Sequence, residues 1–188
     1  MLKQIVISLR GFVPAVLALT MLIAQATAAQ SVTARDYANR AEAEAARGEW
    51  ERAIADYDVA LTLDSRNSVI WWQRGKAWLA LKDPGLALRD FRHALKLAPD
   101  FAATWSDCGE ALQRKGRMEK ALASYNRALE LNPGLADAYA GRGLCRLKEG
   151  KKDEAARDFE RCVALNSRLK PGLDKRIREL DSSLTAQR

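Results

Sequence analysis

The sequence predicts an all-α solenoid, built of four helical hairpins and a closing C-terminal helix. Three observations predict this fold class. An apolar segment at the N-terminus differs from the rest, the remainder is rich in helix-forming residues, and a 34-residue periodicity runs without a gap from Ala34 to Leu169.

The first 29 residues have the layout of a secretory signal peptide. Met1–Arg10 contains two basic residues and no acidic one, an uncharged and mostly apolar run follows to Ala24, and the small residues AQATAAQ come next. Ala26 and Ala28 fit the A-x-A rule, so we expect cleavage after Ala28 or Ala29, followed by a short linker over residues 30–33. The protein is then exported, and the alanine-rich composition favours a bacterial periplasm.

A retained inner-membrane anchor is the alternative to cleavage. A helix that spans a bilayer needs about 20 apolar residues, whereas Arg10 limits the uncharged run to 14 residues and Pro14 lies inside it. These features favour a processed segment. We expect contact with a membrane only if the segment is retained.

The rest of the chain has the composition of a folded, helical protein. Of all residues, 48% are hydrophobic and 29% are charged, and Ala, Leu, Arg, Glu and Lys dominate. These residue types lose little side-chain freedom in a helix. The formal net charge is +7, but basic and acidic side chains are interleaved, as in the segment 151–158. A surface that binds phosphates needs clustered cations, so we expect no nucleic-acid partner.

The periodicity divides the chain into four units, at residues 34–67, 68–101, 102–135 and 136–169. Five places of each unit carry one kind of residue. Place 4 is aromatic, place 8 small, place 20 alanine, place 24 aromatic and place 27 small. In that order the residues are Tyr37, Trp71, Trp105 and Tyr139; Ala41, Gly75, Gly109 and Gly143; Ala53, Ala87, Ala121 and Ala155; Tyr57, Phe91, Tyr125 and Phe159; and Ala60, Ala94, Ala128 and Cys162.

This pattern resembles the tetratricopeptide repeat (TPR) family, and the resemblance covers 136 of the 188 residues. It implies a right-handed superhelix of helix-turn-helix repeats that acts as a non-catalytic scaffold for other proteins. The small residues let two helices approach closely, and the aromatic rings fill the space beside these contacts. We expect the first helix of each unit at places 1–14 and the second at places 17–30.

Turn residues favour these helix bounds. Gly48, Gly116 and Gly150 end first helices, while Asp83 and Pro84 supply a cap and an opening turn in the second unit.

A capping helix is expected over residues 170–185, after the last unit. Its outer face is polar, which keeps the array soluble. Its apolar side carries Leu173, Ile177, Leu180 and Leu184.

An ion pair is expected inside three of the four units. Place 7 is arginine and place 23 is aspartate in the first, second and fourth units, whereas the third unit has Cys108 and Ser124 there. The two places face each other in an antiparallel hairpin, so we predict structural pairs between the two helices. Coincidence among four rows is the alternative. The predicted pairs are Arg40–Asp56, Arg74–Asp90 and Arg142–Asp158.

The sequence lacks a recognisable catalytic or metal-binding constellation. His93 is the only histidine, and Cys108, Cys145 and Cys162 have no metal-ligand spacing. The cysteines replace small or apolar residues, so we expect buried free thiols. Cys145 and Cys162 are offset by about 9 Å along the helix axes, beyond the roughly 7 Å between Cα atoms that a disulfide allows. We expect no enzymatic activity, no metal and no cofactor.

The TPR resemblance implies a concave groove lined by places 2, 5, 9, 12 and 13 of the first helices. Trp72 follows the core residue Trp71 and is predicted to point into this groove, on an apolar floor with Leu79, Leu144 and Leu147. The alternative is that Trp72 packs against a neighbouring first helix. The predicted groove residues are Arg35, Glu42, Trp72, Lys76, Leu79, Glu110, Gln113, Arg114, Leu144, Leu147 and Lys148.

The expected function is that of an adaptor, which holds a protein or peptide segment with apolar anchors and some acidic residues in a preformed groove. A membrane-tethered assembly factor for an envelope complex is one alternative. A polysaccharide-binding module is another, because an exposed tryptophan also stacks on sugars.

Overall fold

The computed structural model describes residues 32–185 of the chain, with side chains to Ser182. The predicted signal peptide and its cleavage site lie outside the described residues, as does the side chain of Leu184. In the described part all regular structure is helical, and a compact unit begins at Ala34. None of the described helices is both long enough and apolar enough to cross a membrane.

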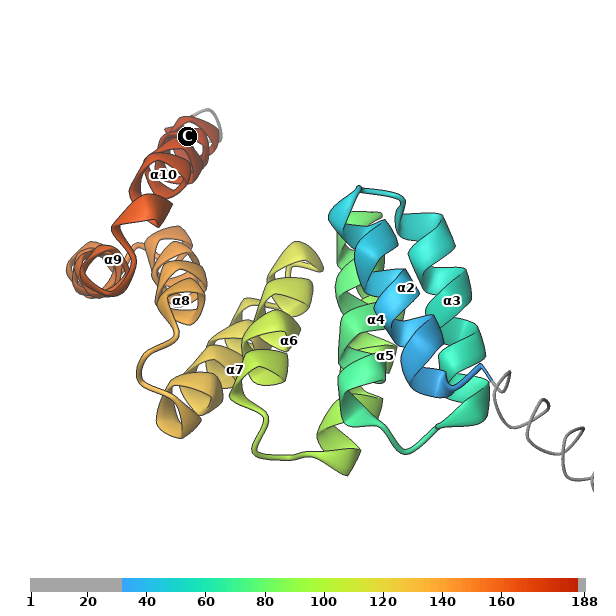
Figure 1. The fold of residues 1–188 in the computed structure, drawn as a ribbon. Helices are drawn as coiled ribbons and strands as arrows, with labels where there is room; N and C mark the ends of the chain where they lie inside the picture. The colour runs from blue at the N-terminus through green and yellow to red at the C-terminus, as the bar shows by residue number, and fades with distance from the viewer. Residues whose placement is uncertain (1–31, 186–188) are drawn as a thin grey trace, which may run out of the picture. The chain divides into compact units, whose positions relative to one another are not determined.

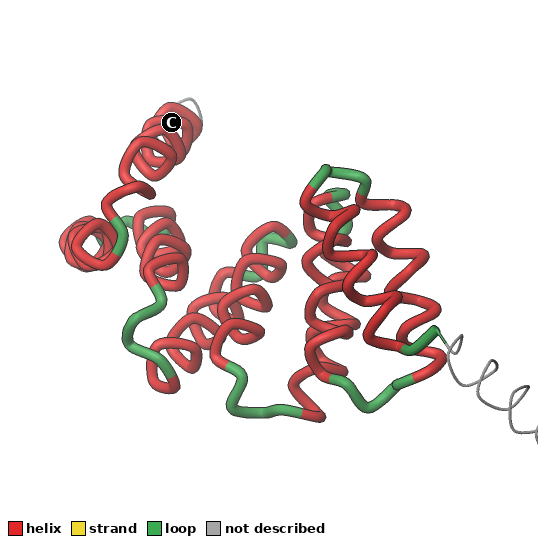
Figure 2. Tube along the Cα trace, in the orientation of Figure 1, coloured by secondary structure: helices red, strands yellow, loops and turns green. Residues whose placement is uncertain are grey.

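Helices α2 to α9 pair into hairpins that follow one another along the chain (Figures 1 and 2). The first helices occupy places 1–13 of each unit, one residue fewer than expected, and the second helices occupy places 17–30. Each second helix also contacts the first helix of the next hairpin, so the hairpins stack in sequence order. The pairs are α2 (Ala34–Ala46) with α3 (Trp50–Leu63), α4 (Ser68–Ala80) with α5 (Pro84–Leu97), α6 (Ala102–Arg114) with α7 (Met118–Leu131), and α8 (Ala136–Lys148) with α9 (Lys152–Leu165).

First helices end early because place 15 adopts a left-handed backbone in every unit. Gly48, Gly116 and Gly150 have φ angles of 80°, 72° and 79°, values that glycine adopts without steric cost. Lys82 has a φ of 62° in the second unit, where a side chain costs about 1–2 kcal/mol. The Asp83 carboxylate then accepts hydrogen bonds from the backbone N–H groups of residues 85 and 86, at 3.0 and 2.9 Å, and caps α5.

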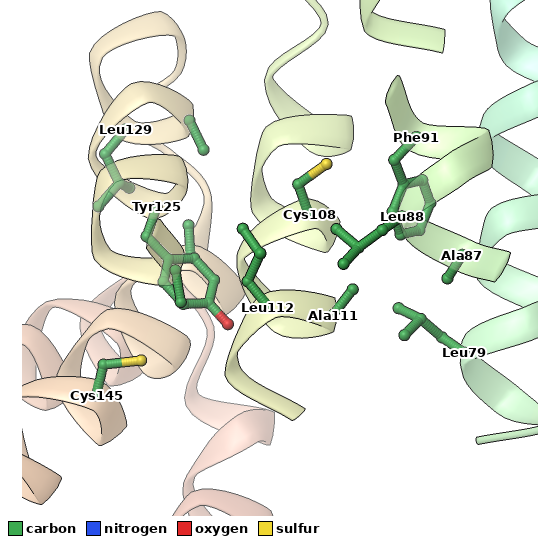
Figure 3. Close-up of a cluster of buried hydrophobic side chains, with 13 residues drawn as sticks. Leu79, Ala87, Leu88, Phe91, Cys108, Ala111, Leu112, Tyr125, Leu129 and Cys145 are labelled. Atoms are coloured by element: carbon green, nitrogen blue, oxygen red, sulfur yellow. The ribbon is translucent and has the colours of Figure 1, made fainter. Parts of the chain in front are cut away.

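Within a hairpin, a small residue at place 8 lies directly beneath the aromatic ring at place 24. A Cβ atom added to Gly75 would lie 2.5 Å from the ring of Phe91, and one added to Gly109 would lie 2.7 Å from the ring of Tyr125. The two helices therefore pack at a separation that only glycine allows in these units. Figure 3 shows the largest buried cluster, which runs from Leu79 of α4 to Cys145 of α8.

The chain closes with a single 3-10 turn, η1 (Ser167–Leu169), and the helix α10 (Lys170–Thr185). Leu173 is buried, and Ile177 and Leu180 pack against the same cluster, which includes Leu144 of α8 and Cys162 of α9. The apolar side of α10 thus covers the last hairpin. The fold class is the predicted all-α solenoid of helical hairpins with a C-terminal helix.

Candidate partner-binding groove

The first helices lie side by side, with α2 in contact with α4, α4 with α6, and α6 with α8. A cavity of about 350 Å³ opens between α4, α6 and α8. We call this surface the groove. Its lining residues are Trp72, Lys76, Ala103, Ser106, Asp107, Glu110, Tyr125, Leu135, Asp137, Gly141 and Arg176.

Trp72 lines the groove and also packs against neighbouring residues, so both interpretations of this side chain apply. Its indole Nε1–H donates a hydrogen bond of 2.7 Å to a carboxylate oxygen of Asp107 on α6. The ring of Phe101 packs against it at 5.0 Å between centroids, and the Lys76 ammonium lies 4.5 Å from the ring centre. The indole is therefore half-buried and held in place, rather than standing free in solvent.

The predicted apolar floor of the groove is wrong. Leu79, Leu144 and Leu147 are only 5%, 3% and 8% exposed, so no partner can reach them. Leu79 is buried in the large cluster with residues of α5 and α6, and Leu144 packs with Leu173 of the closing helix. Residues of α5 and α6 cover Leu79, and Leu173 of α10 covers Leu144, so these places belong to the core.

The groove lining instead mixes apolar side chains with charged ones, and Asp107 is one of its three carboxylates. Burial raises the pKa of the Asp107 carboxyl to about 6, and the nearby Glu110 and Asp137 raise it further. The Trp72 hydrogen bond and the charge of Lys76 act in the opposite direction. Asp107 occupies place 6, outside the places that the family resemblance assigns to the groove. The sequence did hold one sign of this role, because Asp107 is the only acidic residue at place 6, where the other units carry Asn39, Gln73 and Gly141.

A second hollow of about 450 Å³ lies beside the groove, lined by Glu110, Gln113, Arg114 and Arg176. Arg114 binds Glu110 with two nitrogen atoms, and its Nη1 donates to the backbone oxygen of Leu79 at 2.7 Å. Gln113 accepts a 3.0 Å hydrogen bond from the Tyr125 hydroxyl. Arg176 comes from α10, which was predicted only to cap the last hairpin.

The remaining predicted groove residues lie in neither hollow. Arg35 and Lys148 are exposed. Glu42 is exposed as well and accepts a hydrogen bond from the side-chain amide of Gln73.

The structure places the arginine of place 7 against the aspartate of place 23 in three hairpins. Arg74 reaches Asp90 with two bonds of 2.7 and 2.8 Å, and Arg142 reaches Asp158 with bonds of 3.0 and 2.7 Å. Arg40 also binds Asp56 with two nitrogen atoms.

The three arginines differ in burial. The side chains of Arg74 and Arg142 are 13% and 17% exposed, whereas that of Arg40 is 59% exposed. The Arg40 guanidinium holds the pKa of Asp56 below its usual value. The pairs join the two helices of their hairpins, and none of their residues lines the groove cavity.

Histidine and cysteine side chains lie in settings that do not favour reactivity. His93 is exposed and stacks on Trp71, with ring centroids 4.5 Å apart. Cys108, Cys145 and Cys162 are buried and free. Burial raises the pKa of the Cys108 and Cys145 thiols to about 12 and about 11, so both are neutral and poorly nucleophilic at ordinary pH. Within the described residues, no group of His, Cys, Asp and Glu is placed to hold a metal ion.

Antiparallel hairpins of equal length, each packed on the next, define the class of α-solenoid repeat proteins. Comparison with protein families refines this assignment, because the tetratricopeptide repeat family matches residues 102–135 and again residues 136–168. Residues 102–168 of the chain are therefore tetratricopeptide repeats. TPR proteins are typically non-enzymatic scaffolds, and they serve as protein-interaction modules. No curated protein matches the chain by sequence.

Solved structures of TPR proteins resemble the fold. A thermophilic TPR protein of Thermus thermophilus is 20% identical, with a TM-score of 0.69 over 81% of this chain and 83% of its own. The MamA crystal structure is 19% identical, with a TM-score of 0.66 over 78% of this chain and 86% of its own. The first TPR domain of Spaghetti (RPAP3), bound to the HSP90 peptide SRMEEVD, is 24% identical, with a TM-score of 0.61 over 63% of this chain and 94% of its own.

Proposed function

We propose that the chain is a non-catalytic adaptor that holds a segment of a partner polypeptide in the groove. The cavity between α4, α6 and α8 is the observation that supports this function most directly. Its side chains are held by contacts between helices, so little ordering remains to be done when a partner binds. The solved TPR domain with a bound HSP90 peptide is a precedent for peptide binding on this fold.

The partner segment should be polar and donate hydrogen bonds. Three carboxylates line the cavity, at Asp107, Glu110 and Asp137, and they outnumber the two cations, Lys76 and Arg176. Asp107 lines the groove, where a lysine, arginine or amide side chain from the partner would share its half-buried carboxylate with Trp72. The sequence had instead suggested a partner segment with apolar anchors and some acidic residues. That expectation is withdrawn because the leucines expected in the groove floor are buried.

Photo-crosslinking in cells tests the proposal. A photoreactive amino acid at position 76 lies in the groove, and the same amino acid at the exposed position 89 of α5 serves as the matched control. We expect one polypeptide to be captured from position 76 and not from position 89, and to be lost when Glu110→Lys is added. Equal capture from the two positions would refute a groove partner.

We further propose that the protein is exported and that the first 28 or 29 residues are removed. The support is the charged, apolar and small-residue order of that segment. Intact mass of the protein purified from its native host tests this. A full-length mass would refute cleavage and favour the membrane-tethered alternative.

The structure does not favour the alternative of a polysaccharide-binding module. It depended on a free face of Trp72, whereas Lys76 lies over this ring and Phe101 packs beside it.

A further inference from the structure

The place-7 arginines fill the space between successive second helices at two of the three junctions between hairpins. At the junction of the first and second hairpins, Arg74 of α4 binds Asp90 of α5 and also Asp58 of α3. At the junction of the third and fourth, Arg142 of α8 binds Asp158 of α9 and, at 2.8 Å, Asn126 of α7. Each guanidinium thus joins three helices on the side of the array formed by the second helices.

These arginines also cover the aromatic ring at place 4 of their own helix. The guanidinium carbon lies 4.8 Å from the centre of the Trp71 ring in the second hairpin and 5.3 Å from that of Tyr139 in the fourth. At both junctions, the arginine, its aspartate partner and the aromatic ring therefore fill the surface between the second helices.

The middle junction lacks this arrangement because three residues differ there together. Cys108 replaces the arginine, Ser124 replaces the aspartate, and Arg92 stands where the preceding helix elsewhere carries Asp58 or Asn126. The Ser124 hydroxyl turns back to the carbonyl oxygen of Lys120 at 3.0 Å.

A hollow of about 500 Å³ opens at this place between α5, α6 and α7. We call it the wall pocket. Its walls are mostly apolar and include Leu88, Leu95 and Trp105 beside the neutral thiol of Cys108. The Nε1–H of Trp105 donates a hydrogen bond of 2.8 Å to the carbonyl oxygen of Pro99, so the only polar group of this side chain already has a partner. Figure 3 shows Cys108 and Leu112 on α6, on the two sides of which lie α5 and α7.

Three cations, Arg92, Lys96 and Lys120, line the wall pocket, and no carboxylate does. All three are exposed, and none of them forms an ion pair with another described residue. An apolar surface surrounded by unpaired positive charge is complementary to a molecule with an apolar body and an anionic end.

The extent of the pocket favours a small molecule over a helix or strand. The neighbouring junctions are closed by Arg74 and Arg142, so the apolar area is confined to one junction. A docked helix needs anchors spaced over two turns. A volume of about 500 Å³ falls in the range of small-molecule sites.

We propose that the wall pocket binds an apolar carboxylate, with the hydrocarbon or aromatic body against Trp105 and Leu95 and the carboxylate between Arg92 and Lys120. This site is distinct from the groove, which lies between the first helices, and it does not depend on the function proposed for the groove.

Calorimetric titration of the full chain with dodecanoate, below its micelle concentration, tests the proposal. We expect one site, with dodecylamine binding at least tenfold more weakly because its charge is opposite. Arg92→Gln with Lys120→Gln should weaken dodecanoate binding tenfold or more, since two charge-assisted contacts are lost. The matched control is Arg157→Gln, which removes an exposed cation of α9 that does not line the wall pocket.

Closing the pocket should abolish binding. The triple variant Arg92→Asn, Cys108→Arg and Ser124→Asp reproduces the residues of the last junction at the middle one. Ala123→Phe fills the pocket from an exposed position of α7 and serves if the triple variant does not fold. Circular dichroism confirms the fold of each variant.

Four results would overturn the proposal. Dodecanoate could fail to bind the wild-type chain, it could bind equally well to the closed variants, or dodecylamine could bind as tightly. The fourth is binding of the peptide acetyl-Asp-Phe-Asp-amide but not of dodecanoate, which would assign the pocket to an acid-flanked side chain of a protein.

Discussion

Replacing Arg74 by leucine should destabilise the protein more than the same change at either of the other two place-7 arginines. Asp90 is completely buried, and both of its carboxylate oxygens accept hydrogen bonds from Arg74. Arg74→Leu therefore leaves a buried charge without its partner, which typically costs roughly 3–5 kcal/mol. The other acid that Arg74 binds, Asp58, has a side chain that is 56% exposed and can be solvated by water, so its loss adds little.

The structure predicts a smaller effect at the other two sites. Arg142→Leu leaves Asp158 with a second donor, because Nη1 of Arg146 lies 2.7 Å from the same carboxylate. Arg40→Leu removes a guanidinium that water already reaches over most of its surface, and it should cost the least.

The double variant Arg74→Leu, Asp90→Leu separates the pair from the rest of the hairpin. Removing both charges leaves no unpaired group, and leucine packs well in such a site, so its stability should lie within about 1 kcal/mol of the wild type. The difference between the double variant and the sum of the two single variants should then be about 3 kcal/mol or more. Strict additivity would refute the reasoning.

Urea denaturation followed by far-UV circular dichroism measures these differences. The slope of the unfolding free energy with urea should stay unchanged, since the surface exposed on unfolding is the same. An effect of Arg142→Leu larger than that of Arg74→Leu would also contradict the argument, because it would mean that Arg146 does not serve Asp158.

Three further predictions follow from the helix contacts and the groove. Gly141→Ala places a Cβ 2.3 Å from the Tyr125 ring and should destabilise by about 1–3 kcal/mol in urea denaturation, whereas Gly172→Ala meets open space and should stabilise by up to about 1 kcal/mol. Lys82→Gly relieves a left-handed lysine and should raise the free energy of unfolding by about 1 kcal/mol; a loss would show that the Lys82 side chain stabilises the turn. The pKa of Asp107 is raised to about 6 in the folded protein, so between pH 4 and pH 6 the folded state binds a proton that the unfolded state releases. Wild-type stability should therefore fall as pH rises from about 4 to above 6. Asp107→Asn removes that dependence, and the wild-type-minus-variant difference from urea denaturation should therefore change by up to about 3 kcal/mol between pH 4 and pH 7.5; a flat difference would contradict the raised pKa.

The repeat pattern was sufficient to predict most features that depend on one hairpin alone. The helix bounds follow from turn residues such as Gly116, and the pairing of Arg74 with Asp90 follows from the antiparallel register of two helices joined by a short turn. Both are local in sequence. Two details differed: the first helices end one residue earlier than expected, and Lys82 adopts the left-handed backbone that glycine adopts at place 15 of the other units.

Contacts between hairpins were not predictable in the same way. Leu79 and Leu144 occupy places that face the groove in the family pattern, yet a neighbouring hairpin covers the first and α10 the second. Asp107 lines the groove, where it accepts a hydrogen bond from Trp72 of the preceding hairpin. These outcomes depend on how far each hairpin turns relative to the next, and no single row of the repeat encodes that angle.

Helix α6 links the two sites of the molecule. Asp107 faces the groove and its neighbour Cys108 faces the wall pocket, as expected for consecutive residues about 100° apart around a helix. Cys108 also belongs to the largest apolar cluster, which includes residues from α4 to α8. Any substitution in α6 must therefore be measured at both sites. Cys108→Arg should block the wall pocket and leave groove capture from position 76 unchanged, whereas Glu110→Lys should do the reverse. If each change abolished both activities, the two surfaces would not be independent, and loss of α6 itself would be the simpler explanation.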